Sequence, residues 1–330
     1  MLFDDGDPSP APLVGIARLA AQSELLESKT RVQYLELETR RFIGRASGVK
    51  MRFIWTVNPY RGCEFGCRYC YARYAHEFME LRDPLEFERK IFAKRFHAAA
   101  FRAELSRVKG AESIWIGTAT DPYQPAERRF RITRRMLEVL AGERGRKIGI
   151  TTKSDLVAQD TAWLARITRA NIVQVNLTIT TLDEKLARLL EPLAPRPALR
   201  LAAVRTLSKA GIRTAVLAHP ILPLINDSDA GLESLAAAAS EAGASSFSAA
   251  PLFLKPCAQR VFFPFLEEHF PHLVRRYRER YEKSAYLKGH YPEALSARIE
   301  KLVAQYGFAP RDAEELPAEW PVDPQMGLFG

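Results

Sequence analysis

Residues 52–78, RFIWTVNPYRGCEFGCRYCYARYAHEF, place three cysteines directly after a short apolar run that is typical of a strand. Cys63, Cys67 and Cys70 have the spacing C-x3-C-x2-C. Three thiolates on one tight loop can hold three irons of a cubane cluster and leave the fourth iron without a protein ligand. Two glycines within the loop would let the backbone wrap closely around an inorganic cluster. The spacing therefore predicts a [4Fe–4S] cluster on these three cysteines.

A zinc site is the main alternative, because the three cysteines and His76 offer a Cys3His donor set. Structural zinc sites usually combine a C-x2-C pair with a second, distant pair, and the sequence has no second pair. Cys257 stands alone, and we interpret it as a buried apolar residue. The position of the loop after a strand favours the cluster over zinc.

Short apolar runs alternate with helical patterns along most of the chain, and this alternation predicts the fold. We expect strands within 52–60, 113–120, 147–154, 172–181, 212–223 and 245–256. Strands that alternate with helices indicate a parallel sheet, and six units fit an α/β fold of the partial (β/α)6 TIM type. In such a barrel the functional groups gather at the carboxyl ends of the strands.

The domain organisation that we predict has four parts, with the barrel in the middle. Residues 11–50 are interpreted as an irregular, basic segment, and the end of the chain as an open acidic tail. The expected parts are an N-terminal lead-in at 1–50, the barrel at 51–256, C-terminal helices at 257–306 and the tail at 307–330.

Charge and composition narrow the class of protein. The net charge is +9 at pH 7 although both ends are acidic, and a basic body suits an anionic partner such as DNA. One helical pattern places Arg275, Arg276, Arg278 and Arg280 together for phosphate contacts, although a solvated helix face is an equal alternative. The sequence shows neither a membrane-spanning run nor a signal peptide, so we expect a cytoplasmic protein without a membrane partner.

A longer pattern carries a family resemblance. NPYRGC…GC-x-YCYAR is followed by GTATDPYQP, TTKS and LEP-x-AP-x-P-x2-RL, over most of residues 52–256. This pattern resembles the spore photoproduct lyase-like branch of the radical S-adenosylmethionine superfamily. The resemblance implies reductive cleavage of S-adenosylmethionine at the cluster to generate a 5′-deoxyadenosyl radical, an electron donor such as flavodoxin or ferredoxin, and DNA or a modified nucleobase as substrate. A small-molecule substrate and a zinc-bound nucleic-acid-binding protein are the alternatives.

The resemblance also implies that strand-end residues bind S-adenosylmethionine. Thr120 and Asp121 are expected at the amino group, and an ammonium is expected at the carboxylate. Residues of the fourth strand are expected at the ribose or the sulfonium. The expected set is Tyr69, Thr120, Asp121, Lys153, Ser154, Asn176, Thr178 and Thr180.

Two tyrosines and one threonine bear on the chemistry that the resemblance implies. Tyr69 and Tyr71 match two tyrosines that photoproduct lyases use near their radical chemistry, where a phenol can relay a hydrogen atom. Packing around the cluster and adenine is their alternative role, above all for Tyr69. Thr118 stands where lyases with a cysteine hydrogen donor carry that cysteine, three residues before Asp121. The resemblance therefore does not extend to repair of the spore photoproduct itself.

The extreme C-terminus carries a short motif. Gln325-Met326-Gly327-Leu328-Phe329 resembles the Q-L-x-L-F peptide by which bacterial repair proteins dock on the sliding clamp, with Met326 in place of leucine. A linear motif on an open tail can enter a groove without cost to the fold. The motif makes the sliding clamp a candidate partner, and a chance match or folding back of the tail onto the barrel are the alternatives.

Overall fold

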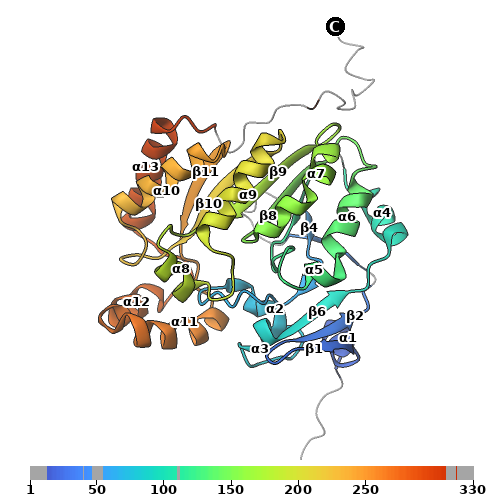
Figure 1. Ribbon diagram of the computed structural model, residues 1–330. Coiled ribbons are helices and arrows are strands. Elements are labelled where there is room, and N and C mark those ends of the chain that lie inside the picture. The colour runs from blue at the N-terminus through green and yellow to red at the C-terminus, as the bar shows by residue number, and fades with distance from the viewer. Residues whose placement is uncertain (1–12, 40, 47–54, 110–111, 310–316, 318–330) are drawn as a thin grey trace, which may run out of the picture.

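A seven-stranded sheet forms the centre of the molecule in a computed structural model that describes residues 13–39, 41–46, 55–109, 112–309 and 317 (Figure 1). Its strand order is β11-β10-β9-β8-β7-β4-β3. The six strands of this sheet other than β3 pair in parallel, whereas β3 (Ile43–Arg45) is antiparallel to β4. The parallel strands are β4 (Trp55–Val57), β7 (Ser113–Ile116), β8 (Lys147–Thr152), β9 (Ile172–Thr178), β10 (Arg213–Ile221) and β11 (Ser246–Pro251). Each lies within an expected range, which confirms the partial α/β barrel.

Helices between the strands cover the outer side of this sheet (Figure 1). Ile150 and Val175 are fully buried, in keeping with parallel strands that are covered on both faces. Met136 and Leu137 of α6 are fully buried in the same core. The helices of this part are α4 (Ala98–Leu105), α5 (Glu127–Phe130), α6 (Ile132–Leu140), η2 (Asp155–Asp160), α7 (Thr161–Ile167), α8 (Glu184–Leu190), α9 (Pro197–Lys209) and α10 (Asp229–Glu241).

A second, four-stranded sheet lies beside the barrel, and its order is β1-β2-β6-β5 (Figure 1). The expectation of an irregular segment over 11–50 was wrong, because this segment forms α1, β1, β2 and β3. The reason is that β2 buries Tyr34 and Leu37 while it pairs with a strand more than fifty residues later. The elements are α1 (Gly15–Ala21), β1 (Glu24–Ser28), β2 (Gln33–Leu37), β5 (Tyr60–Arg61) and β6 (Lys90–Lys94).

The C-terminal helices pack against the cysteine loop and the edge of the barrel. Phe262 and Tyr277 share one core cluster with Cys63 and Cys67. Arg275 is 93% exposed, whereas the tyrosines of its helix face inward. The helices are α11 (Pro256–His269), η3 (Pro271–Leu273), α12 (Val274–Tyr281) and α13 (His290–Gln305).

Two sequence expectations concern the end of the chain and the membrane. The motif at Gln325–Phe329 lies outside the described residues, so docking on the sliding clamp stays a prediction. In the part of the chain that the structure describes, no helix is both long and apolar enough to cross a bilayer.

Candidate active site

The cysteine loop runs from β5 to the short helix η1 (Tyr71–Arg73) and is fixed by backbone contacts. The Cys63 amide donates a hydrogen bond to the Phe87 carbonyl of α3 (Glu86–Arg89) at 2.9 Å. Gly62 has a φ of +82°, and a Cβ there would lie 2.7 Å from the Lys90 carbonyl oxygen. Only glycine fits this backbone. The buried Arg73 guanidinium also donates to the Cys67 carbonyl at 3.1 Å.

The segment GTATDPYQP, residues 117–125, follows β7 and fixes the cysteine loop by hydrogen bonds. The Gln124 side chain donates from Nε2 to the Gly62 carbonyl at 3.1 Å and accepts from the Glu64 amide at 3.0 Å. The Thr120 hydroxyl donates to the same Gly62 carbonyl at 2.6 Å. The conformation of the cysteine loop therefore depends on residues more than fifty positions away.

A cavity of about 310 Å³ opens between the cysteine loop and the carboxyl ends of the parallel strands. All three cysteines of the loop line it; Cys63 and Cys67 are buried, and Cys70 is partly exposed. The sequence-predicted residues that line it are Tyr69, Tyr71, Thr120, Asp121, Lys153 and Thr178. The strand-end rule thus brings most of the predicted set together.

Ser154, Asn176 and Thr180 do not belong to the lining, and each is bonded within the protein. The Ser154 hydroxyl accepts from the Leu156 amide at 3.3 Å where η2 begins. The fully buried Asn176 donates to the Ile150 carbonyl at 3.2 Å. It shares a face of β9 with Thr178 but lies one pleat deeper in the sheet.

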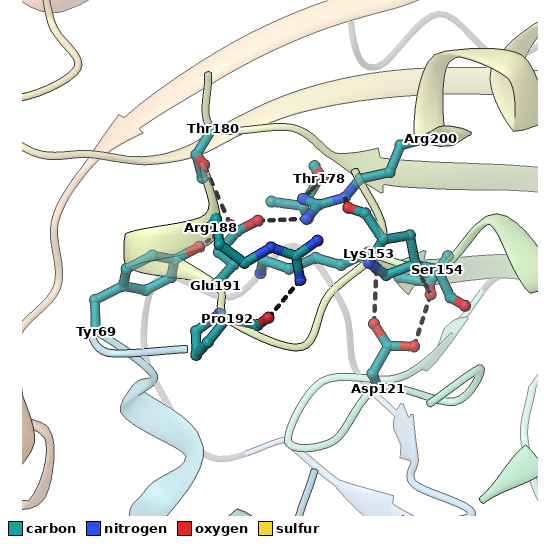
Figure 2. Close-up of polar contacts among 12 residues, drawn as sticks. Tyr69, Asp121, Lys153, Ser154, Thr178, Thr180, Arg188, Glu191, Pro192 and Arg200 are labelled. Carbon is teal, nitrogen blue, oxygen red and sulfur yellow. Dashed lines mark hydrogen bonds and ion pairs between the residues drawn. The ribbon is translucent and has the colours of Figure 1, made fainter. Parts of the chain in front are cut away.

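Asp121 ties the ends of β7 and β8 together, as Figure 2 shows. One carboxylate oxygen accepts from the Thr152 hydroxyl at 2.6 Å and from the Tyr123 amide at 2.9 Å. The other accepts from the Lys153 amide at 2.7 Å. Burial raises the pKa of Asp121, and the Thr152 hydrogen bond opposes this shift.

Sequence reasoning missed a buried ion pair between Glu191 and Arg200 (Figure 2). Their Oε2 and Nη2 atoms lie 2.5 Å apart, and both side chains are at most 1% exposed. Tyr69 donates its phenol proton to Glu191, and Arg200 also donates to the Thr178 carbonyl at 3.0 Å. Both residues belong to the LEP-x-AP-x-P-x2-RL pattern, which is part of the family resemblance.

The electrostatics of the cavity combine buried thiols with cations. Burial raises the pKa of all three cysteines, that of Cys67 to about 12, and the Lys153 ammonium opposes this shift at Cys67. Burial lowers the pKa of Lys153, but Cys67 and Glu191 outweigh it and leave the pKa raised. Burial likewise raises the pKa of Glu191, but Arg200 and Lys153 reverse the shift. Lys153 is thus an ammonium and Glu191 a carboxylate.

The position of His76 does not favour the zinc alternative. Its Nε2 atom lies 3.0 Å from the Lys90 carbonyl oxygen, and its ring packs edge-on against Phe87 and Phe92. Burial lowers the pKa of His76 to about 4. Among the described residues, no three Cys, His, Asp or Glu side chains are placed to hold one ion. A cubane cluster does not require that convergence, because each thiolate binds a different iron.

Aromatic side chains surround the mouth of the cavity. Tyr71 is 40% exposed and donates its phenol proton to the Thr118 carbonyl. Its ring lies 5.8 Å from that of Phe253, which stacks on Tyr286 at 4.4 Å. Cys257 is buried with its Sγ 3.7 Å from the Tyr71 carbonyl oxygen and does not line the cavity, as its interpretation as an apolar residue predicts.

Known proteins share this architecture and sequence pattern. A family model described as the radical SAM superfamily matches residues 57–235. An uncharacterized protein of Mycobacterium tuberculosis is 35% identical over 258 residues, which cover 78% of this chain and 76% of the relative. An uncharacterized protein of Methanocaldococcus jannaschii is 28% identical over 173 residues, which cover 52% of this chain and 62% of the relative.

The fold also resembles that of a solved structure. Spore photoproduct lyase complexed with dinucleoside spore photoproduct matches with a TM-score of 0.57 at 15% identity, over 83% of this chain and 79% of the lyase. At this identity the likeness concerns the fold alone, and it agrees with the branch that the sequence pattern indicates. Together with the cysteine loop at the strand ends, the comparisons show that the chain belongs to the radical SAM superfamily and is a radical SAM enzyme.

Proposed function

We propose that this radical SAM enzyme uses a [4Fe–4S] cluster on Cys63, Cys67 and Cys70 to act on a nucleobase of DNA. The observation that carries the proposal is that the three thiols and the polar strand ends line one cavity. Exposed aromatic rings lie next to this cavity. The alternative within the superfamily is a small-molecule substrate.

The residues present fit the cluster. Three thiols line one wall, and the loop around them is closed by a glycine whose Cβ would meet backbone. Because burial keeps the thiols protonated, metal binding must displace their protons, and the Lys153 cation favours the resulting negative charge. Together with S-adenosylmethionine and an electron donor such as flavodoxin or ferredoxin, the cluster supplies a 5′-deoxyadenosyl radical.

The strand-end residues have separate roles in holding S-adenosylmethionine. The Lys153 ammonium suits the carboxylate of the methionine part. Asp121 uses three of its roughly four acceptor positions within the protein, which leaves one for the amino group. Thr178 suits the ribose, while Tyr69 holds Glu191 beside the cavity. Asp121 thus has two roles, since it also fixes the backbone of Lys153.

The aromatic rim supports a nucleobase as substrate. The name aromatic rim stands for Tyr71, Tyr74, Phe78, Phe253 and Tyr286. Three of these are more than a third exposed: Tyr71 at 40%, Phe78 at 62% and Tyr286 at 64%. The rings follow one another at centre distances of 4.4 to 6.4 Å, and the Lys255 Nζ lies 4.0 Å from the centre of the Tyr74 ring. Exposed rings beside a cation are the usual platform for stacked bases, each worth about 1–3 kcal/mol.

The cluster is tested by anaerobic reconstitution with iron and sulfide. We expect a brown protein that forms 5′-deoxyadenosine from S-adenosylmethionine when reduced, and a Cys67→Ala variant that loses both the colour and the product. Cys257→Ala is the matched control, since its thiol lies outside the cavity, and it should keep both. A colourless wild type with one zinc would contradict the proposal.

The substrate is tested with deuterium. Single-stranded oligonucleotides with deuterated bases should transfer deuterium into 5′-deoxyadenosine, and Tyr286→Ala should weaken oligonucleotide binding at least fivefold, as loss of one stacked base predicts. Leu199→Ala on α9, which also removes an exposed apolar side chain, should bind like the wild type. If no oligonucleotide transfers deuterium while the wild type turns over with a small molecule, the nucleobase proposal is wrong.

A further inference from the structure

A second cavity, of about 730 Å³, lies between β3 and β4 of the barrel and β5 and β6 of the second sheet. Its lining is strongly basic. The basic residues are Arg41, Arg45, Arg61, Lys94 and Arg107. Glu104 is the acidic residue in this lining among the described residues, and its carboxylate is occupied by the amides of Phe42 and Ile43 at 2.8–3.1 Å. We call this space the cationic cavity.

Two of its cations sit on neighbouring strands and on the same face. Arg61 of β5 is paired with Phe92 of β6, so its side chain lies on the Phe92 side of the sheet. Lys94 lies two residues beyond Phe92 and therefore on that side as well. The two cations are diagonal neighbours, and both line the cavity.

Neither cation has an ion-pair partner among the described residues. Lys94 is 9% exposed, and Glu104, the acidic group that acts on its ammonium, is already bonded to two backbone amides. The Arg61 Nε is buried and has no partner. A buried charge is costly unless a counter-charge meets it, and two adjacent cations repel each other in addition. The arrangement is that of a site prepared for an anion.

We call the cavity of about 310 Å³ that the three cysteines line the cluster cavity. The cationic cavity shares a wall with it, because Ala119 lines both. The Asn58 amide group fixes this wall, because its oxygen accepts from the Ala119 amide at 2.8 Å and its nitrogen donates to the Thr118 hydroxyl at 3.2 Å. Asn58 itself lines the cationic cavity. One short strand-end segment thus separates the radical chemistry from the unpaired cations.

The aromatic rim joins the two cavities. Tyr71 and Phe253 line the cluster cavity, whereas Tyr74 and Phe78 line the cationic cavity. The Tyr71 and Tyr74 rings stack with centres 6.4 Å apart and planes 21° from parallel. A ligand whose flat ring stacks on the rim can therefore place an attached anionic group in the cationic cavity.

We propose that Arg61 and Lys94 bind a phosphate group of the substrate, adjacent to the base that enters the cluster cavity. The guanidinium fork suits two phosphate oxygens at once, and the lysine supplies a compact second charge. The proposal rests on the proposed action on DNA and assigns the phosphate-binding part of that same site. The phosphate belongs either to an internal phosphodiester or to a terminal monophosphate, since both offer the same oxygens.

The test measures binding to the reconstituted protein under anaerobic conditions at several salt concentrations. The ligands are a labelled single-stranded oligonucleotide, a nucleoside 5′-monophosphate, the nucleoside and inorganic phosphate. Lys94→Met should weaken oligonucleotide binding at least tenfold and lower the salt dependence by about 0.7 in the logarithmic slope, as loss of one phosphate contact predicts. Binding of the uncharged nucleoside should not change.

Controls separate a binding role from a structural one. Lys209→Met removes an exposed lysine at the end of α9 and should behave as the wild type. Lys94→Arg should restore part of the oligonucleotide affinity, and inorganic phosphate should raise the melting temperature of the wild type but not of Lys94→Met. Arg61→Gln should reproduce the loss, with iron content measured because Arg61 lies two residues before Cys63.

The outcomes are distinct. Tight, Lys94-dependent binding of the monophosphate identifies a terminal phosphate, and tight, Lys94-dependent binding of the oligonucleotide alone identifies a phosphodiester; both support the proposal. Equal oligonucleotide affinity of Lys94→Met and Lys209→Met overturns it. If binding depends on Lys94 but no deuterium leaves the base, the phosphate site stands while the proposed action on the nucleobase fails.

Discussion

Lys94→Met should stabilise the protein at neutral and lower pH, although it removes a charge that we assign to substrate binding. Burial first, and the Arg61 cation second, lower the pKa of Lys94 from 10.5 to about 7. This difference corresponds to about 5 kcal/mol by which the charged ammonium destabilises the folded protein below pH 7. At about 2.1 cal/mol/K of unfolding entropy per residue, removing that cost raises the melting temperature by about 7 °C.

The lowered pKa of Lys94 sets the direction in which the stability of the wild type changes with pH. Between pH 7 and 10.5 the unfolded chain binds more protons at Lys94 than the folded protein does, so the wild type gains stability as the pH rises through this window. The advantage of Lys94→Met is therefore full below pH 7 and shrinks toward pH 10. Burial raises the pKa of Tyr60 and of Tyr74, the tyrosines of this lining. The charged or titratable residues around Lys94 in this lining are Arg41, Arg45, Tyr60, Arg61, Tyr74, Glu104 and Arg107.

The assay is thermal unfolding of the reconstituted protein at pH 6, 8 and 9.5, in chloride buffers without phosphate or sulfate. Lys209→Met is again the control, because its ammonium is exposed and its loss should leave the melting temperature unchanged. A Lys94→Met variant that melts below the wild type at pH 6 would refute the reasoning, since it would show that the ammonium has a stabilising partner.

Other predictions concern residues that fix the loops and strand ends around the cluster cavity. Arg200→Met should lower the free energy of unfolding by about 3–5 kcal/mol, because it leaves Glu191 buried and unpaired, and the added change Glu191→Gln should recover part of this loss in denaturant unfolding. Gly117→Ala should lower the free energy of unfolding by well over 1 kcal/mol, because φ is +89° and the new Cβ would lie 2.5 Å from the Thr151 carbonyl oxygen. Gly211→Ala, which is also at positive φ but in open space, should lower it by about 1 kcal/mol. Asp121→Asn should weaken S-adenosylmethionine binding about tenfold in equilibrium dialysis, since an amide is a poorer acceptor for three donors. An unchanged dissociation constant would remove Asp121 from the site.

The barrel could be predicted because its signals are local. Each strand has its own apolar run, each crossover helix its own periodicity, and parallel connections allow essentially one arrangement. The convergence of Cys63, Thr120, Lys153 and Thr178 on one cavity then follows from the strand ends. The second sheet could not be predicted in this way, because β2 pairs with β6 across more than fifty residues and its own pattern is short.

Burial explains why some residues of the candidate sites could not be predicted from the sequence. Glu191 and Arg200 have the residue types of a solvent-exposed pair, and only the packing of α9 beneath the strand ends makes them a buried one. The same holds for Lys94, a lysine at the end of a strand whose exposure depends on how two sheets meet. The depth of Asn176 within its strand is likewise a matter of register, which the sequence does not specify.

The shared core of the cysteine loop and the C-terminal helices has a consequence for biosynthesis. Cys70 leaves the ribosome about 180 residues before Phe253 and α11, an interval of about 10 to 40 s at usual elongation rates. During this time the three thiols lack the wall that later covers them. The loop on which we propose the cluster is therefore made early in translation and is enclosed only after the C-terminal helices have been made.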